Sequence, residues 1–221
     1  MPLFPLRQVL VPGLILPLNI FEPRYVAMIR DLAQLPPHER TFGVVALRQG
    51  RDAGTEHRPE HLHEVGCTAL IREIDEQEDG RFLVATAGAV RFRLHDLDAT
   101  GKPYLTGLVS ALDEPDGEDD PEALEQLALG VAGSWDDYRE RLGIAASGLP
   151  DTSVPAPVVL SYLVVAGMVL DLPERQSLLE IPDTASRLRA ERRLLRREQV
   201  LIDELHSLPA IDLAATENSP N

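Results

Sequence analysis

The sequence predicts an α+β protein, with a mostly β N-terminal half that carries one inserted helix and a helical C-terminal half. Two observations carry this prediction. Up to about residue 112, apolar residues come in short, alternating runs separated by Gly and Pro, which is typical of strands. After about residue 121, they recur at helical spacing in longer segments. A change of architecture is therefore expected between residues 112 and 121.

The alternation is clearest in AVRFRLH, residues 89–95, where Val90, Phe92 and Leu94 should face the core and the basic residues between them should face away. Further strands are predicted at Leu3 to Leu10, Leu14 to Ile20, Thr41 to Leu47, Val65 to Asp75, Arg81 to Ala87 and Tyr104 to Leu112. Asp79-Gly80 predicts a hairpin turn before Arg81, because this pair supplies the positive φ of tight hairpins.

One helix should interrupt the strands. Pro23 suits a first helical turn, and apolar residues follow it at helical spacing up to Leu32. In the second half, helices are predicted at Pro121 to Leu142, Val154 to Leu170, Pro173 to Glu180 and Pro182 to Leu208. The last of these repeats Leu188, Leu195 and Ile202 every seven residues, which predicts an apolar stripe packed on the other helices.

Between the halves lies the acidic run DEPDGEDDPE, Asp113 to Glu122. Its like charges repel, and its Pro and Gly residues oppose regular structure. The predicted organisation is therefore a β subdomain at 1–112, an acidic linker at 113–120, a helical subdomain at 121–208 and a flexible tail at 209–221.

Charge and cysteine content limit the classes of partner and the compartment. The net charge of −15 and the pI near 4.7 disfavour binding to nucleic acid or anionic lipid, which depends on Lys and Arg. Cys67 is the only cysteine, so no intrachain disulfide can form. It should be a small core residue, and a reducing, cytoplasmic location is expected.

Two apolar stretches could be mistaken for membrane or export segments. Val9 to Ile20 is interrupted by Pro12 and Pro17, follows no basic cluster and is therefore interpreted as folded protein. Val154 to Leu172 approaches the length of a membrane span, but it contains prolines and lacks flanking Lys or Arg. A buried helix is expected there, with no membrane partner.

Six blocks of the sequence, in order, carry a family resemblance. They are LFPLRQVLVPGLILPLNIFEPRY from Leu3, FGVVAL from Phe42, HEVGCTALI from His63, DGRFLVATAGAVRFRL from Asp79, YLTGLV from Tyr104 and LPERQSLLEIPDTASRL from Leu172. Together they resemble the N-terminal substrate-binding domain of Lon proteases over about residues 3–206. The resemblance implies a PUA-like β pseudo-barrel followed by a helical bundle. It also implies recognition of unfolded or hydrophobic polypeptide segments, as an adaptor for a proteolytic machine or as a holding factor.

The residues also indicate what chemistry to expect. Lon's ATPase module needs a Gly-rich loop ending in Gly-Lys-Ser/Thr, and its peptidase uses a Ser-Lys dyad. The only lysine here, Lys102, follows Gly101 and precedes Pro103. We therefore expect the recognition domain alone, which is not an enzyme and needs no cofactor.

The block NIFEPRY supplies the candidate peptide-binding residues, Phe21, Glu22, Arg24 and Tyr25. Arg and Tyr are favoured anchors at binding surfaces. The same residues also suit a purely structural role, in which Glu22 lies at a helix start, Tyr25 packs inward and Arg24 pairs with an acid. The two interpretations are compatible.

Two other functions remain as alternatives. His57, His61 and His63, with neighbouring glutamates, could hold a metal for a hydrolase, although they lack the frame of known zinc motifs and also suit a solvated loop. PUA-like barrels also bind RNA, and the last helix carries a basic run between Arg189 and Arg197. Intervening glutamates and the acidic run are competing partners for that face.

Overall fold

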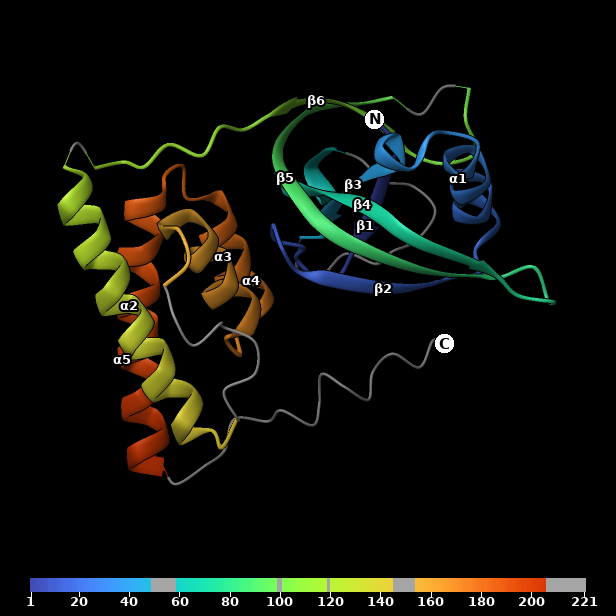
Figure 1. Ribbon diagram of the computed structural model, residues 1–221. Coiled ribbons are helices and arrows are strands. Elements are labelled where there is room, and N and C mark those ends of the chain that lie inside the picture. The colour runs from blue at the N-terminus through green and yellow to red at the C-terminus, as the bar shows by residue number, and fades with distance from the viewer. Residues whose placement is uncertain (49–58, 99–100, 119, 145–153, 206–221) are drawn as a thin grey trace. The chain divides into compact units, whose positions relative to one another are not determined.

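The computed structural model describes residues 1–48, 59–98, 101–118, 120–144 and 154–205. The chain divides into two compact units. The β unit comprises Met1–Asp113 together with Leu172–Glu180, and the helical unit comprises Glu114–Asp171 and the chain from Ile181 onward. Both classes of structure that the sequence predicts are present, which confirms the α+β assignment (Figure 1).

The β unit is built on one curled, mixed sheet (Figure 1). Its strands are β1 (Leu3–Leu6), β2 (Ile15–Ile20), β3 (Thr41–Ala46), β4 (Val65–Glu76), β5 (Phe82–Asp98) and β6 (Thr106–Ala111). The strand order is β1-β3-β4-β5-β2, and β6 pairs with the second half of β5. β1 runs parallel to β3, and the other pairs are antiparallel. The β4–β5 hairpin turns at Gly80, whose φ of 82° confirms the predicted turn.

The strand β5 joins two segments that the sequence predicted separately, and its face pattern is partly different from the prediction. Phe92 and Leu94 are buried as expected, but Val90 is 48% exposed and Arg91 is buried. The cause is a bulge in β5, where the two residues Ala89 and Val90 lie opposite the single residue Thr68 of β4. The Thr68 hydroxyl accepts from the Val90 N–H and donates to the Val90 C=O in place of a regular ladder pair. The alternation of inward and outward side chains along β5 is therefore shifted where the strand passes through the bulge.

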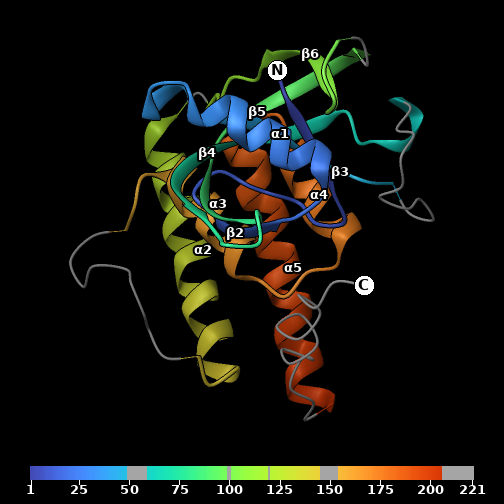
Figure 2. The same cartoon turned by 90° about the vertical axis from the view of Figure 1, so that its right-hand side faces the viewer.

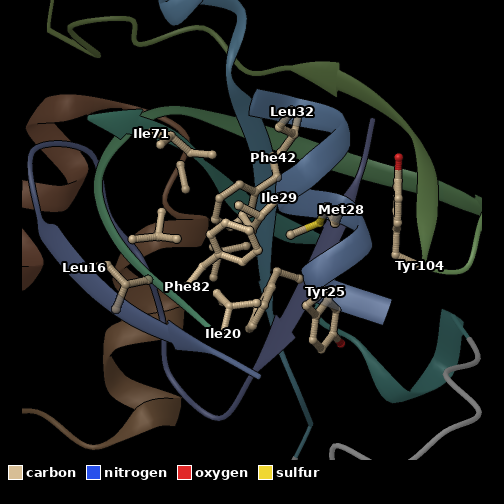
Figure 3. Close-up of a cluster of buried hydrophobic side chains, with 14 of the residues drawn as sticks. Leu16, Ile20, Tyr25, Met28, Ile29, Leu32, Phe42, Ile71, Phe82 and Tyr104 are labelled. Atoms are coloured by element: carbon tan, nitrogen blue, oxygen red, sulfur yellow. The ribbon is translucent and has the colours of Figure 1, made fainter. Parts of the chain in front are cut away.

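Helix α1 (Pro23–Ala33) packs against the inner side of the curled sheet (Figures 1 and 2). Its buried residues Tyr25, Met28, Ile29 and Leu32 meet apolar side chains of β2, β3 and β5 (Figure 3). Cys67 is also buried in this core, as predicted.

A short helix from the second half of the sequence belongs to the β unit. This helix, α4 (Leu172–Glu180), is held by buried polar contacts. Gln176 donates to the Val65 C=O at 3.0 Å, and the buried Arg91 guanidinium donates to the Leu179 C=O at 2.8 Å. A cation at the last carbonyls of a helix is favourable, because the negative end of the helix dipole lies there. The division therefore differs from the predicted helical subdomain at 121–208.

The helical unit contains α2 (Pro121–Arg141), α3 (Pro157–Gly167) and α5 (Thr184–Leu205). Asp120 caps α2 by accepting from the Glu122 N–H at 3.0 Å. The predicted stripe of α5 lies in the core shared by these helices, with Leu188 and Leu195 fully buried. No helix in the described part of the chain is long and apolar enough to cross a membrane.

The described residues of the acidic run from Glu114 onward belong to the helical unit. The backbone N–H groups of Thr184 and Ala185, at the start of α5, donate to the carbonyls of Pro115 and Asp116 at 2.9 Å. The run therefore supplies acceptors for N–H groups that have no partner within their own helix. This packing differs from the flexible linker expected at 113–120, because the sequence pattern alone does not show that α5 offers donors to it.

Candidate functional site

The predicted residues Glu22 and Arg24 form an ion pair at the start of α1. Glu22 is the N-cap residue, with an extended backbone, and Pro23 begins the helix. The Glu22 carboxylate accepts from Arg24 Nε at 3.0 Å and lies 2.8 Å from Arg24 Nη2. Among the described residues, the Glu22 side chain makes no capping hydrogen bond to the helix N–H groups. The carboxylate thus orients Arg24 while lying near the positive end of the helix.

Tyr25 is a core residue, although Arg24 lies over its ring. The Arg24 Cζ atom is 4.6 Å from the Tyr25 ring centroid, and the Tyr25 ring is 4.1 Å from that of Phe4. The side chain is only 3% exposed, and burial raises the pKa of the Tyr25 hydroxyl to about 12, partly opposed by the Arg24 charge. The structural interpretation of Tyr25 is therefore confirmed, and its ring offers little surface to a ligand.

Phe21 differs from its three neighbours, because it is 49% exposed. It follows directly after β2 and precedes the N-cap residue of α1. The structure thus brings Glu22, Arg24 and Tyr25 into one packed group and leaves Phe21 at the surface.

The outer face of the sheet beside Phe21 carries further exposed apolar side chains. In the antiparallel pairing of β2 with β5, Leu18 faces Val84, and both of these side chains turn inward. The alternate positions point outward, so that Ile15 is 63% exposed, Pro17 is exposed and Leu83 is 45% exposed. Ile15, Pro17, Phe21 and Leu83 are called the outer apolar patch below.

Ile15, Pro17 and Leu83 are not among the binding residues predicted from the sequence. The alternation in ILPLNI could have identified the first two, since Leu16, Leu18 and Ile20 form the inward series. Leu83 could not be added from the sequence pattern, because its neighbours depend on the register between β2 and β5.

β2 is an edge strand in the described part of the sheet. The Gly88 N–H donates to the Leu14 C=O at 2.9 Å, so the backbone groups of the even-numbered residues of β2 face β5. The backbone N–H of residue 17 would therefore point away from the sheet, toward the unpaired edge of β2. Because Pro17 has no N–H, this edge lacks one hydrogen-bond donor. This favours contact through the outer side chains over addition of a further strand.

The histidine candidates do not form a metal site in the described structure. His57 lies outside the described residues, and His61 ends a short 3₁₀ helix, Pro59–His61. The Nδ1 atom of His63 lies 3.4 Å from a Glu180 carboxylate oxygen. Among the described residues, no group of three or more His, Cys, Asp or Glu side chains is arranged to hold a metal ion.

The basic run of α5 is partly neutralised. Arg189 lies 2.6 Å from Glu118 of the acidic run, and Arg197 lies 2.6 Å from Glu198. Arg193 is exposed on the same helix. These ion pairs are of the two kinds expected from the sequence, one with the acidic run and one with a glutamate of the same helix.

Comparison with known proteins identifies consistent similarities. A protein-family model described as the substrate-binding domain of ATP-dependent protease La (LON) matches residues 1–197. Lon protease 2 of Syntrophobacter fumaroxidans is 29% identical over 193 residues, which is 84% of this chain and 23% of that protein. The Lon protease of Trichlorobacter lovleyi is 30% identical over 211 residues, which is 91% of this chain and 24% of that protein. The chain thus spans about a quarter of the length of these relatives.

Solved structures are similar over nearly the whole chain. The crystal structure of a Lon N-terminal domain protein from Xanthomonas campestris matches with a TM-score of 0.62 and 25% identity, covering 89% of this chain and 96% of that one. The N-terminal domain of a Mycobacterium avium complex Lon protease matches with a TM-score of 0.61 at 15% identity, covering 90% and 97% of the two chains. The second similarity concerns the fold alone.

Proposed function

Because the chain belongs to the family of LON substrate-binding domains, we propose that it binds unfolded or hydrophobic polypeptide segments through the outer apolar patch of its β unit. The supporting observation is the patch itself. Ile15 of β2, Phe21 directly after β2 and Leu83 of β5 are each close to half exposed or more, and the exposed Asn19 lies opposite Leu83 on the same face. Exposed apolar side chains gathered on one face are typical of a protein interaction site.

The predicted peptide-binding residues take different parts in this proposal. Phe21 is the direct contact, because it is the exposed aromatic residue of the patch. Glu22 and Arg24 form an ion pair directly after Phe21 in the chain, and this pair stabilises the segment that joins β2 to α1. Tyr25 supports this segment from within the core by packing its ring against that of Phe4.

We also propose that this chain contributes recognition without chemistry of its own. The matching family model is that of a substrate-binding domain, and this chain matches about a quarter of the length of its Lon relatives. In this proposal the chain presents polypeptide substrates to a proteolytic machine as an adaptor, or holds them as a separate factor.

The test is the affinity of the purified protein for a fluorescently labelled, unfolded apolar peptide with uncharged flanks. Replacing Phe21→Ser and Leu83→Ser together should weaken binding about tenfold, since exposed aromatic anchors often contribute more than 1 kcal/mol. The matched control is Leu108→Ser, which removes a 66% exposed leucine from β6 of the same unit and should change affinity less than about twofold. Circular dichroism should show all variants folded.

Equal weakening by the control and by the patch variant would contradict the proposed location. Tight, salt-sensitive binding of single-stranded RNA in place of peptide, lost on replacing Arg193 and Arg196, would contradict the proposed function.

A further inference from the structure

The outer apolar patch has an acidic border on the neighbouring strand. Across the sheet, Pro17 of β2 lies opposite Ala85 of β5, which in turn lies opposite Glu73 of β4. Two residues further along β4, Asp75 lies opposite Leu83 of β5, and both belong to the outward-facing positions. Residues paired in this way point to the same face of a sheet, so both carboxylates lie on the face that carries the patch. Both side chains are exposed.

Neither of these two carboxylates forms an ion pair with a described residue. The nearby arginines Arg24, Arg30 and Arg81 are paired with other acids, and Asp75 accepts only a hydrogen bond from the neutral Gln77 amide at 2.8 Å. Arg72 occupies the irregularity in β4 between Ile71 and Glu73, and it too forms no ion pair with a described residue. With Arg72 counted, the border remains negative overall, because it has two carboxylates and one guanidinium.

The border lies within reach of a bound peptide. Neighbouring strands are about 4.8 Å apart, so β4 lies about 10 Å from β2, with β5 between them. That separation is close to the Debye length of about 10 Å at 0.1 M salt, so charges at this distance still interact. The side chain between Pro17 and Glu73 is only the methyl group of Ala85, which leaves room for a long cationic side chain to lie across β5.

We propose that the outer apolar patch, together with Glu73 and Asp75, selects apolar polypeptide segments that are flanked by Lys or Arg. This selectivity rests on the function proposed above and adds to it the charge of the preferred ligand. The apolar side chains of the segment contact Ile15, Phe21 and Leu83, and the flanking cation pairs with the border. A segment flanked by acidic residues meets like charges at the same place, and the net charge of −15 repels it at longer range.

The experiment uses three peptides with one apolar core, flanked on both sides by two Lys, two Ser or two Glu. At low salt, the Lys-flanked peptide should bind about threefold to tenfold more tightly than the Ser-flanked one, as exposed charge pairs typically allow. The Glu-flanked peptide should bind more weakly than both. The preference should fall below about twofold near 0.5 M salt, because the charges are then screened.

The double variant Glu73→Gln with Asp75→Asn should lose most of the preference for Lys while keeping its affinity for the Ser-flanked peptide. Asp96→Asn with Asp98→Asn is the matched control, since it removes two exposed carboxylates from the far end of β5 and should keep the preference. Equal affinities for the three peptides, or equal loss of preference in both double variants, would overturn the inference and leave the proposed function standing. Failure of all three peptides to bind would contradict the proposed function, and the selectivity with it.

Discussion

The Arg187 guanidinium of α5 lies 3.1 Å from a Glu114 carboxylate oxygen in the acidic run that precedes α2. Arg187 is fully buried, its Nε donates to the Ser161 hydroxyl at 2.9 Å, and its Cζ lies 4.0 Å from the Tyr162 ring centroid. The Tyr162 hydroxyl donates to the other Glu114 oxygen at 2.6 Å. One buried cation therefore joins the acidic run to both α3 and α5.

Replacing Arg187→Ala should reduce the free energy of unfolding of the helical unit by about 3–5 kcal/mol, because it leaves the Glu114 carboxylate without this cation. The matched control is Arg189→Ala on the same helix, whose partly exposed pair with Glu118 should contribute less than about 1 kcal/mol. Urea denaturation followed by circular dichroism measures both changes. Equal effects of the two substitutions would contradict the importance assigned to the buried pair.

The ion pairs of Glu114 with Arg187 and of Glu118 with Arg189 predict the protease sensitivity of the acidic run. In the unmodified protein, a glutamate-specific protease should cut slowly at Glu114 and Glu118, since both side chains are engaged by arginines of α5. Cleavage there should become much faster in Arg187→Ala. Rapid cleavage of the unmodified protein at these two sites would show instead that the run behaves as an open linker.

Glu191 should make the helical unit less stable as the pH rises. Its side chain is fully buried on α5, and neither carboxylate oxygen has a hydrogen-bond partner among the described residues. Burial raises the pKa of Glu191 well above its ordinary value, although the Arg187 charge opposes the shift. Above the unfolded-state pKa of about 4.3, the folded state holds a proton that the unfolded state has lost. The stability that this proton provides therefore decreases until the pH passes the folded-state pKa.

Glu191→Gln should consequently stabilise the unit at neutral pH and remove that part of its pH dependence. Denaturation midpoints between pH 4.5 and pH 8 measure the effect, with Glu198→Gln as the control on the same helix, because Glu198 is paired with Arg197. An unchanged pH dependence in Glu191→Gln, or destabilisation at pH 8, would contradict the assignment.

Tyr25 should affect stability at alkaline pH and leave peptide binding unchanged. Its folded-state pKa of about 12 lies above the value of about 10 in an unfolded chain. The stability it provides is therefore complete below pH 10 and decreases as the pH rises toward 12. Tyr25→Phe should reduce this decrease and should bind the apolar peptide as the unmodified protein does, whereas Tyr25→Ala should lose about 3–5 kcal/mol through the cavity it creates. Loss of peptide affinity in a stable Tyr25→Phe variant would show instead that its hydroxyl contacts the ligand.

Local patterns in the sequence predicted the elements, whereas contacts between distant residues decided how they group. The inserted helix and the turn at Gly80 follow from local chemistry and were confirmed. The exposure of Val90 could not be predicted, because the bulge in β5 that reverses its face depends on the pairing with Thr68 of another strand. The association of α4 with the β unit depends on Arg91, which the alternation alone placed toward solvent.

The candidate site shows the same limit. The inward packing of Tyr25 and the pairing of Arg24 with an acid were predicted from their places at a helix start, and both were confirmed. The patch around Phe21 was not predicted as a group, because Leu83 and the border at Glu73 join it only through strand register. Register is fixed by the whole sheet and cannot be obtained from one strand.

The most direct test of the central claim is amide chemical-shift mapping of the ¹⁵N-labelled protein as an unfolded apolar peptide is added. We predict that the largest shifts occur in β2, at Phe21 and at residues 82–85 of β5, with smaller ones at Glu73 and Asp75 of β4. The basic run from Arg189 to Arg197 should be almost unaffected. Shifts confined to that run, or no shifts on β2 and β5 at saturating peptide, would contradict polypeptide recognition by the outer apolar patch.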